Sequence, residues 1–276
     1  MATLLHLSDI HFGPKHLEDR SAAVLGMVER QPPDLVVVSG DLTQRAKIRQ
    51  FRAARQFFAR LAAPAVFVPG NHDVPLWRFW ERLFAPFGAW RRGFDRELVR
   101  DFFSPALAVV GVNTAHAWTT KHGRIRRGDI SGLAGRFTAA GAGAFRVLVA
   151  HHPIVAAPEL GDEPVARRGG ELIAAARRCG VELVLSGHLH HAFEVPAERA
   201  LPGGGPLVLQ CGTTTSSRGR GAETGHNSFH RITVEPDGIV VERLLWNRES
   251  RAFELAVTHR HRRAGAASGR DIIRRT

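Results

Sequence analysis

Short apolar runs of strand length recur along this chain, and segments of helical periodicity lie between several of them. A chain that alternates in this way folds as an α/β domain. After residue 189 the pattern changes to short β-like runs separated by glycine-rich turns, which predicts a second, more antiparallel sheet. The expected strands are residues 3–7, 35–38, 65–68, 107–112, 145–150 and 181–185 in the first part, and residues 206–210, 229–234 and 239–245 in the second.

The chain is long and apolar enough for one domain with a full hydrophobic core, since it has 276 residues of which 44% are hydrophobic. We expect that domain to cover residues 1–258. Residues 259–276 are rich in Arg, Gly and Ala and lack a steady period, which predicts a basic tail that is mobile or only partly helical.

Three features favour a cytoplasmic protein. The N-terminus enters an apolar run directly, without the basic segment, long apolar segment and cleavage site of an exported chain. Charged residues or prolines interrupt each apolar run before it reaches the roughly 18 residues that cross a bilayer. The two cysteines, Cys179 and Cys211, show no CxxC spacing, as expected in a reducing compartment.

The net charge of +12 comes almost entirely from arginine. Such a charge suits polyanions, acidic membrane surfaces or phosphorylated substrates, although a coding bias toward Ala, Arg and Gly produces the same composition. We find no recognisable nucleic-acid-binding module to accompany it. The charge therefore leaves a phosphate ester and an anionic membrane as the expected partners.

Polar residues with metal-binding side chains follow the predicted strands. Open α/β sheets bind ligands at the carboxyl ends of their strands, so these side chains are expected to converge at one edge. The clusters are Asp9-Ile10-His11, Gly40-Asp41, Gly70-Asn71-His72-Asp73, His151-His152-Pro153 and Gly187-His188-Leu189-His190. Two metal ions are the economical interpretation, because the ligand candidates are too many for one tetrahedral ion. These candidates are Asp9, His11, Asp41, Asn71, His151, His188 and His190.

Carboxylate oxygen combined with imidazole nitrogen suits a borderline divalent ion such as Mn, Fe, Zn, Co or Ni. Asp41 is the natural ligand to bridge two such ions, because Gly40 lets the backbone approach them. An ion pair about 3.5 to 4 Å apart lowers the pKa of a bridging water toward neutrality, which generates hydroxide for in-line attack on phosphorus.

Other polar residues are candidates for catalysis or for contact with the substrate. His72 lies between two ligand-type residues, so its ring is expected near the substrate as a proton or hydrogen-bond donor, with Asp73 orienting it. Asn71, His72 and His116 are the candidates for substrate contact. Residues 213–220 carry hydroxyls and two arginines that could bind a phosphate, or they form an ordinary loop.

With these clusters in order, the chain resembles the calcineurin-like metallophosphoesterase superfamily, whose signature runs D-x-H, G-D, G-N-H-D/E, H and G-H-x-H. The match covers about two thirds of the chain, from Asp9 to His190. The opening from Leu7 to Gly13 is similar to the bacterial cyclic-nucleotide (class III) phosphodiesterase branch, which also includes glycerophosphodiesterases. The resemblance implies a four-layer αββα sandwich with two mixed β-sheets. It also implies one metal ion on Asp9, His11, Asp41 and His190, and another on Asp41, Asn71, His151 and His188.

A departure from that pattern is an insert over residues 74–103, which is dense in aromatic residues and arginine and is expected to overhang the site. Its aromatic residues fall at helical spacing and form a single apolar stripe. The stripe either packs on the core or lies on an anionic membrane or lipid-like substrate. The residues of the stripe are Trp77, Trp80, Phe84 and Phe87.

The preferred function is therefore a dinuclear phosphodiesterase acting on a small substrate, either a cyclic nucleotide or a glycerophosphodiester. One alternative is a hydrolase of lipid-linked phosphate or pyrophosphate esters at the membrane surface. An alternative of a different class is a non-catalytic binding scaffold, against which the complete ligand set and His72 argue.

Overall fold

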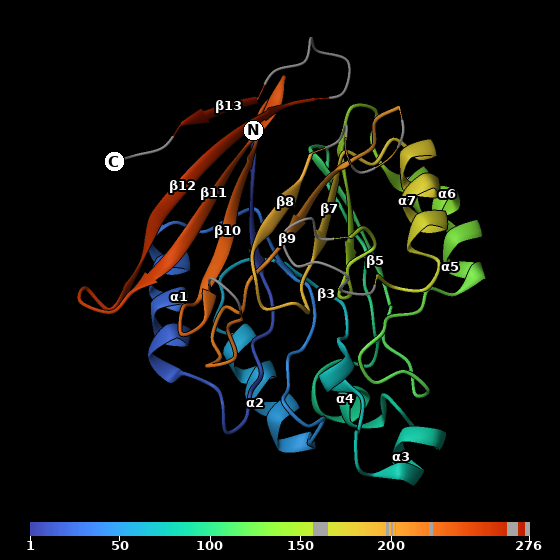
Figure 1. Cartoon of the computed structure of the whole chain (residues 1–276), viewed down its shortest axis with the longest axis vertical. Coiled ribbons are helices and arrows are strands. Elements are labelled where there is room, and N and C mark those ends of the chain that lie inside the picture. Colours follow the sequence, from blue (N-terminus) through green and yellow to red (C-terminus); the bar gives the residue numbers. More distant parts are fainter. Residues whose placement is uncertain are drawn as a thin grey trace.

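Two β-sheets face each other and helices cover their outer faces in the computed structural model (Figure 1). The structure describes residues 1–156, 165–196, 199, 201, 203–220, 223–263 and 270–273. In spatial order the first sheet contains β13 (Arg270–Ile273), β12 (Ala252–Arg262), β11 (Gly238–Asn247), β10 (Ser228–Val234), β1 (Ala2–Leu7), β2 (Leu35–Val38) and β3 (Ala65–Phe67). The second contains β4 (Phe102–Phe103), β5 (Leu107–Val112), β6 (Phe145–Ala150), β7 (Leu183–Ser186), β9 (Leu207–Gln210) and β8 (Phe193–Val195).

The helices lie on the outer faces and at one end of the sandwich (Figure 1). Those of the first half are α1 (Glu18–Arg30), α2 (Ile48–Phe58), the 3-10 turn η1 (Asn71–Asp73), α3 (Phe79–Phe84) and α4 (Gly88–Gly93). Those of the second half are α5 (Arg127–Ser131), α6 (Leu133–Arg136), the 3-10 turn η2 (Phe137–Ala139) and α7 (Gly169–Arg178). No helix in these described segments is long and apolar enough to cross a bilayer.

Three hydrophobic cores hold the four layers together. On β1, Leu4 points into the core between the two sheets, whereas Leu5 and Leu7 point into the core beneath α1 and α2. This division follows from the pleat, because successive side chains of a strand point to opposite faces. The second sheet packs in the same way against α7 on its outer face. The expected four-layer αββα sandwich with two mixed sheets is confirmed.

The antiparallel strands near the C-terminus do not form a separate sheet, contrary to the expectation from their pattern. β10 pairs antiparallel with β1, in a register that places Ala2 opposite Val234, and β11 to β13 extend the same sheet. β1 is buried on both faces, so the backbone N–H and C=O groups along both of its edges need a partner strand. β9 instead inserts parallel to β7 in the second sheet.

β12 crosses the expected domain boundary at residue 258 and continues to Arg262. Residues 259–262 are therefore strand rather than the start of a mobile or partly helical tail. Alternation of His and Arg over these residues matches a strand with two different faces. β13 pairs with β12, placing Thr258 opposite Ile273. The remainder of the expected tail, residues 264–269 and 274–276, lies outside the described residues.

The aromatic insert does not form one stripe. Trp77, Trp80 and Phe84 are 81%, 70% and 76% exposed, while Phe87 and Trp90 are buried. Helix α3 ends at Phe84 because Pro86 cannot continue it. The next helix is α4, and its Trp90 packs against Phe51 of α2. The stripe therefore divides into Phe87, which is buried directly before α4, and an exposed part around α3.

Candidate active site

The loops that follow β1, β2, β3, β6 and β7 meet at one end of the two sheets, the end that also carries α3 and α4 in Figure 1. Backbone strain concentrates in these loops. Asp9, His11, Asp41, His188 and His190 all have positive φ, between 52° and 77°. Residues other than glycine adopt this conformation rarely, and they do so most often at functional sites. The strained turns direct these side chains into a shared space.

The first group of converging side chains consists of Asp9, His11, Asp41 and His190, all of them buried. His190 Nε2 lies 3.0 Å from Asp9 Oδ1 and 3.1 Å from His11 Nε2. His11 Nε2 lies 3.6 Å from Asp41 Oδ2. Among the described residues no donor hydrogen-bonds to Asp9 Oδ1 or Asp41 Oδ2. Buried acceptors without donors are costly, and a cation at this place would satisfy them.

The second group surrounds the amide oxygen of Asn71. This oxygen lies 3.2 Å from His151 Nε2 and 3.0 Å from His188 Nδ1. Asp41 Oδ1 lies 3.5 Å from the same His151 nitrogen. Asp41 therefore directs one oxygen toward each group, which is the arrangement expected of a residue shared by two ions.

Backbone carbonyls fix the orientation of two of these imidazoles. His151 Nδ1 donates to the carbonyl oxygen of Ser39 at 2.7 Å, and His190 Nδ1 donates to that of Arg218 at 2.8 Å. Each ring consequently presents the lone pair of Nε2 to the site, as a metal-binding histidine does. Asp9 Oδ2 accepts from the Ser8 hydroxyl at 2.6 Å and the His188 backbone N–H at 2.9 Å, which leaves Oδ1 facing the first group.

The electrostatics of the protein alone favour a cation. Burial lowers the pKa of His11 and of His188 well below the ordinary value, so both imidazoles are neutral. Burial, followed by the charges of Asp9 and Asp73, raises the pKa of Asp41 well above its usual range. Neutral imidazoles and crowded carboxylates match the donor set of a borderline divalent ion, so the residues present fit a metal centre.

Close backbone approach requires glycine at two places in this site. A Cβ at Gly70 would collide with the side chain of Asp41, and a Cβ at Gly187 would collide with Ser8. Both glycines belong to the clusters predicted from the sequence. They allow the loops after β3 and β7 to pack directly against the carboxylates.

His72 lies beside the first group, with its ring 4.8 Å from that of His11 and perpendicular to it. Its Nδ1 donates to the Gln44 carbonyl oxygen at 3.0 Å, and Arg218 Nη1 lies 3.5 Å from the same nitrogen. Burial and the nearby charge of Arg218 lower the pKa of His72 to about 4. Its backbone N–H donates to Asp41 Oδ1 at 2.8 Å. The ring therefore offers Nε2 to a substrate.

The structure assigns Asp73 a different part from the one expected. Both of its carboxylate oxygens are engaged by two donors each, which are the backbone N–H groups of Leu42, Thr43 and Gly70 and the Thr43 hydroxyl. The distances range from 2.9 to 3.1 Å. Gln44, and not Asp73, orients the His72 ring. Asp73 instead joins the loop after β2 to the loop after β3.

His116 lies on the loop after β5, outside both groups. Its Nε2 is 2.8 Å from the carbonyl oxygen of Arg124, so this end of the ring is engaged by the backbone. His152 is buried behind His188, with ring centroids 4.5 Å apart, and its Nδ1 lies 2.7 Å from the Thr114 hydroxyl. The structure therefore brings the seven expected ligands and His72 together but leaves His116 at the periphery.

Several supporting residues escaped prediction. Ser8 and Ser39 each precede a ligand cluster at a strand end, so their position was a usable signal. Gln44 gave no such signal, because it acts through its backbone carbonyl. Arg218 was not missed in this way, since it belongs to residues 213–220, whose two arginines the sequence offered as possible phosphate ligands.

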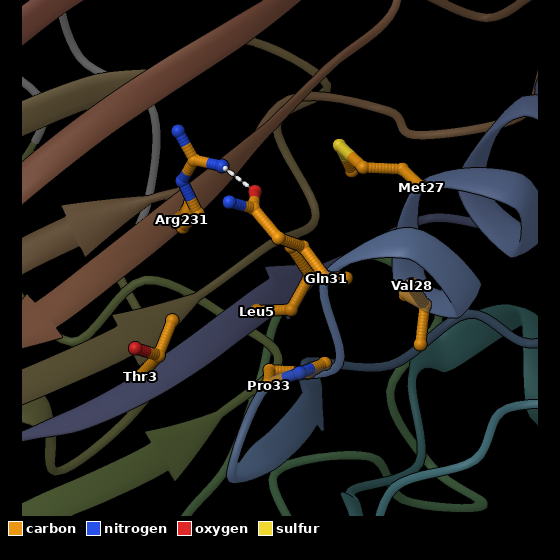
Figure 2. A pocket seen from close by; sticks show the side chains of 7 residues that line it. All are labelled: Thr3, Leu5, Met27, Val28, Gln31, Pro33 and Arg231. Carbon is orange, nitrogen blue, oxygen red and sulfur yellow. Dashed lines mark hydrogen bonds between the residues drawn. The ribbon is translucent and has the colours of Figure 1, made fainter.

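A separate pocket lies between β1, α1 and β10, where Figure 2 shows Arg231 donating a hydrogen bond to Gln31. Arg231 Nη1 lies 2.8 Å from Gln31 Oε1. The only charged residue of the pocket, Arg231, also pairs with Glu242 at 2.7 Å. The pocket is lined by Thr3, Leu5, Met27, Val28, Gln31, Pro33 and Arg231. Its residues come from β1, from α1 and the turn that follows it, and from β10, so none of them lies on the loops that carry the candidate ligands.

Comparison with known proteins places this chain in a family. A probable cyclic nucleotide phosphodiesterase from Synechococcus is 30% identical over 180 residues, which span 63% of this chain and 64% of that protein. A cAMP/cGMP dual specificity phosphodiesterase from Mycobacterium tuberculosis is 29% identical, over 86% of this chain and 77% of that protein.

Solved structures agree at the level of the fold. A dimetal phosphatase from Danio rerio superposes with a TM-score of 0.64 at 11% identity, over 87% of this chain and 95% of that one. The model of the family described as calcineurin-like phosphoesterase matches residues 2–192, more than half of the chain. This chain therefore belongs to the calcineurin-like phosphoesterase family.

Proposed function

We propose that this chain is a metal-dependent phosphodiesterase that hydrolyses a small substrate, either a cyclic nucleotide or a glycerophosphodiester. The orientation of Asp41 carries the proposal, because its two oxygens face two separate groups of ligand atoms. A protein that only bound phosphate would not require two buried acceptors without donors in the same place.

The proposed ligand sets follow the two groups. One ion would be held by Asp9, His11, Asp41 and His190, and the other by Asp41, Asn71, His151 and His188. When bound, such a pair acidifies water toward neutral pH and neutralises charge on the phosphate oxygens. The nitrogen and oxygen donors suit Mn, Fe, Co, Ni or Zn. Asn71 contributes a neutral amide oxygen, so the carboxylates leave the loaded site positive and attractive to an anionic ester.

His72 and Arg218 would act on the substrate directly. With Nδ1 donating to Gln44, the free Nε2 gains a proton when an anionic ester stabilises the imidazolium form. It then donates to a phosphate oxygen or to the leaving oxygen. Arg218, whose guanidinium approaches the same ring, is placed to bind a phosphate oxygen.

The names of the relatives favour a diester, since both the Synechococcus and the Mycobacterium tuberculosis proteins are described as cyclic-nucleotide phosphodiesterases. A relative from Enterobacter lignolyticus, 34% identical over 80 residues, is described as a glycerophosphodiester phosphodiesterase. These descriptions define the two substrate classes that we propose for this chain.

Model substrates test the proposal. Metal-stripped protein resupplied with Mn is assayed on bis-p-nitrophenyl phosphate and on p-nitrophenyl phosphate, with Asn71→Ala as the control for contaminating activity. Faster turnover of the diester, absent from the control, supports the proposal and leads to 3′,5′-cyclic AMP and glycerophosphocholine as the next substrates. Faster turnover of the monoester would overturn the diester preference, and inactivity on both would favour a binding scaffold.

A second candidate is the hydrolysis of lipid-linked phosphate esters at an anionic membrane, and the exposed aromatic patch favours it. We define this patch as Trp77, Phe79, Trp80, Phe84 and Trp118, which are all at least 60% exposed. The Arg82 guanidinium joins its two segments, because it donates to the carbonyl oxygens of Pro75 and Thr119. Interfacial aromatics beside basic residues are typical of proteins that bind anionic bilayers, and exposed cations follow Trp118 along the chain. These cations are Lys121, Arg124, Arg126 and Arg127.

Co-sedimentation with vesicles tests this second candidate. We expect the protein to sediment with vesicles of mixed phosphatidylserine and phosphatidylcholine, and the double variant Trp77→Ala/Trp80→Ala to remain in the supernatant. Phe103→Ala is the matched control, since Phe103 is an exposed aromatic residue on β4 outside the patch. Equal sedimentation of all three proteins would contradict a membrane role for the patch.

A further inference from the structure

A second concentration of histidine and carboxylate lies away from the candidate active site, where the edge strand β8 of the second sheet meets β12 of the first. It consists of Glu194 on β8 and of His259 and His261 on β12, and we call it the Glu194 clasp. One potential ligand atom from each residue lies within 4.8 Å of the others. None of these three residues belongs to the site described above.

Strand register explains why the three side chains meet. His259 pairs with Val241 of β11 and His261 pairs with Ile239, so each histidine shares a sheet face with its partner. Val241 and Ile239 both belong to the core between the two sheets. The two histidines, two positions apart on β12, therefore point toward the second sheet.

Glu194 points toward the same space from the opposite sheet. Its neighbours Phe193 and Val195 belong to the core on the outer face of the second sheet, beneath α7. Because side chains alternate along a strand, Glu194 between them faces inward. Its partner on β9, Leu209, belongs to the core between the sheets. The carboxylate is therefore held at the inner edge of the second sheet.

The contacts in the clasp use one carboxylate oxygen for each imidazole. His259 Nδ1 lies 2.6 Å from Glu194 Oε1, and His261 Nε2 lies 3.1 Å from Glu194 Oε2. The side chains of Glu194, His259 and His261 are 12%, 16% and 11% exposed, so solvent reaches the clasp although most of it is buried. Both nitrogens approach the carboxylate from the same strand, as two ligands of one ion would.

We propose that the Glu194 clasp is a third metal site, separate from the active site, that binds one zinc or similar borderline divalent ion through Glu194, His259 and His261. Two imidazole nitrogens and one carboxylate oxygen form a donor set that zinc uses in proteins, whereas calcium and magnesium prefer oxygen alone. Binding requires each ring nitrogen that now faces the carboxylate to present its lone pair to the ion, so the proton on that nitrogen moves to the other nitrogen of the ring or to solvent. The bound ion joins β8 to β12 and so links the two sheets at their edges.

Zinc stoichiometry tests the proposal. The full-length protein is incubated with excess zinc, separated from unbound metal by gel filtration, and analysed for zinc per chain by mass spectrometry. The double variant His259→Ala/His261→Ala is expected to hold about one ion fewer than the wild type. His226→Ala, which removes an exposed histidine outside the clasp, is expected to match the wild type. Because the readout is a difference of one ion, it does not depend on how many ions the active site holds.

A conservative variant covers the case in which the double variant fails to fold. Glu194→Gln keeps the shape and hydrogen-bonding capacity of the side chain but removes the anionic ligand. We expect zinc to raise the melting temperature of the wild type more than that of Glu194→Gln, with about one ion fewer bound by the variant. Equal zinc content in wild type and Glu194→Gln would overturn the proposal and would leave the clasp as a hydrogen-bonded link between the sheets.

Discussion

The candidate active site and the Glu194 clasp use the same chemical groups in different ways. Five of the seven proposed active-site ligands have positive φ, and two of their buried carboxylate oxygens, on Asp9 and Asp41, have no hydrogen-bond donor among the described residues. The clasp is built on regular strands, and each oxygen of Glu194 faces an imidazole nitrogen. Strain together with unmet acceptors indicates a place that needs an outside partner. Both carboxylate oxygens of the clasp already have hydrogen-bond partners, so an ion bound there would stabilise the fold and take no part in catalysis.

The largest expected effect follows from changing Asp41, because it alone faces both groups of ligands. Asp41→Asn keeps the shape but removes the shared charge, so we expect diesterase kcat/KM to fall by at least about 10³-fold, together with a loss of bound metal. Glu194→Gln is the matched control and should keep wild-type activity. If Asp41→Asn kept its activity within tenfold of the wild type, the candidate active site would be no more important for catalysis than the Glu194 clasp, which would contradict the account.

The next effect concerns His72, which would act on the substrate without holding metal. His72→Ala should lower kcat by about 10² to 10⁴-fold, the usual contribution of a positioned proton donor. Its metal content should stay at the wild-type level, because the ligand atoms of both groups are untouched. Metal analysis beside steady-state kinetics checks both parts, and a parallel loss of metal would place His72 among the ligands.

The convergence of the proposed ligand residues could be predicted from the sequence, because each follows an apolar run and the carboxyl ends of strands meet at one edge. The hydrogen-bond partner of the His72 ring could not be predicted, because this partner is the backbone carbonyl of Gln44 and a backbone carbonyl has no sequence signature. The expected role of Asp73 was wrong for a related reason. Proximity in sequence suggested a contact with His72, but the backbone N–H groups of Leu42, Thr43 and Gly70 compete for the same carboxylate.

The strands could be predicted where they are buried on both faces, and could not be predicted where they are very short or alternate between polar and apolar side chains. The boundaries of β2, β5 and β6 agree with the apolar runs. β8 is only three residues long, and β12 alternates between polar and apolar side chains, so neither forms an apolar run. Both strands of the clasp therefore escaped prediction, since pairing with distant strands and not local sequence creates them.

A third prediction concerns stability rather than chemistry. Asp73→Ala leaves the buried N–H groups of Leu42, Thr43 and Gly70 without their acceptor, so we expect a loss of about 3 kcal/mol in the free energy of unfolding. Urea denaturation of the metal-free protein measures this value. Asp73→Asn, which keeps one acceptor oxygen, should lose less. An unchanged urea midpoint for Asp73→Ala would refute the structural role of this carboxylate.

The smallest effect is the pH dependence of the clasp. Burial alone would raise the pKa of Glu194, but hydrogen bonds from His261 and His259 lower it from the ordinary 4.5 to about 2. A carboxyl whose pKa is lower in the folded state stabilises the protein above pH 4.5, and this stability is lost as pH falls toward 2. Between pH 5 and pH 3 the wild type should lose roughly 1 to 2 kcal/mol more than Glu194→Gln. Melting temperatures of both proteins across this range, without metal, check the difference, and parallel curves would contradict it.

The most direct test of the dinuclear site is a metal titration of the activity itself. Metal-stripped Glu194→Gln, which lacks the third site proposed above, receives increasing Mn, and the rate of bis-p-nitrophenyl phosphate hydrolysis is recorded against bound Mn per chain. We predict that the rate is negligible without metal and saturates at about two bound ions, because Asp41 serves two groups of ligands. Full activity with one bound ion, or without metal, would contradict the dinuclear site.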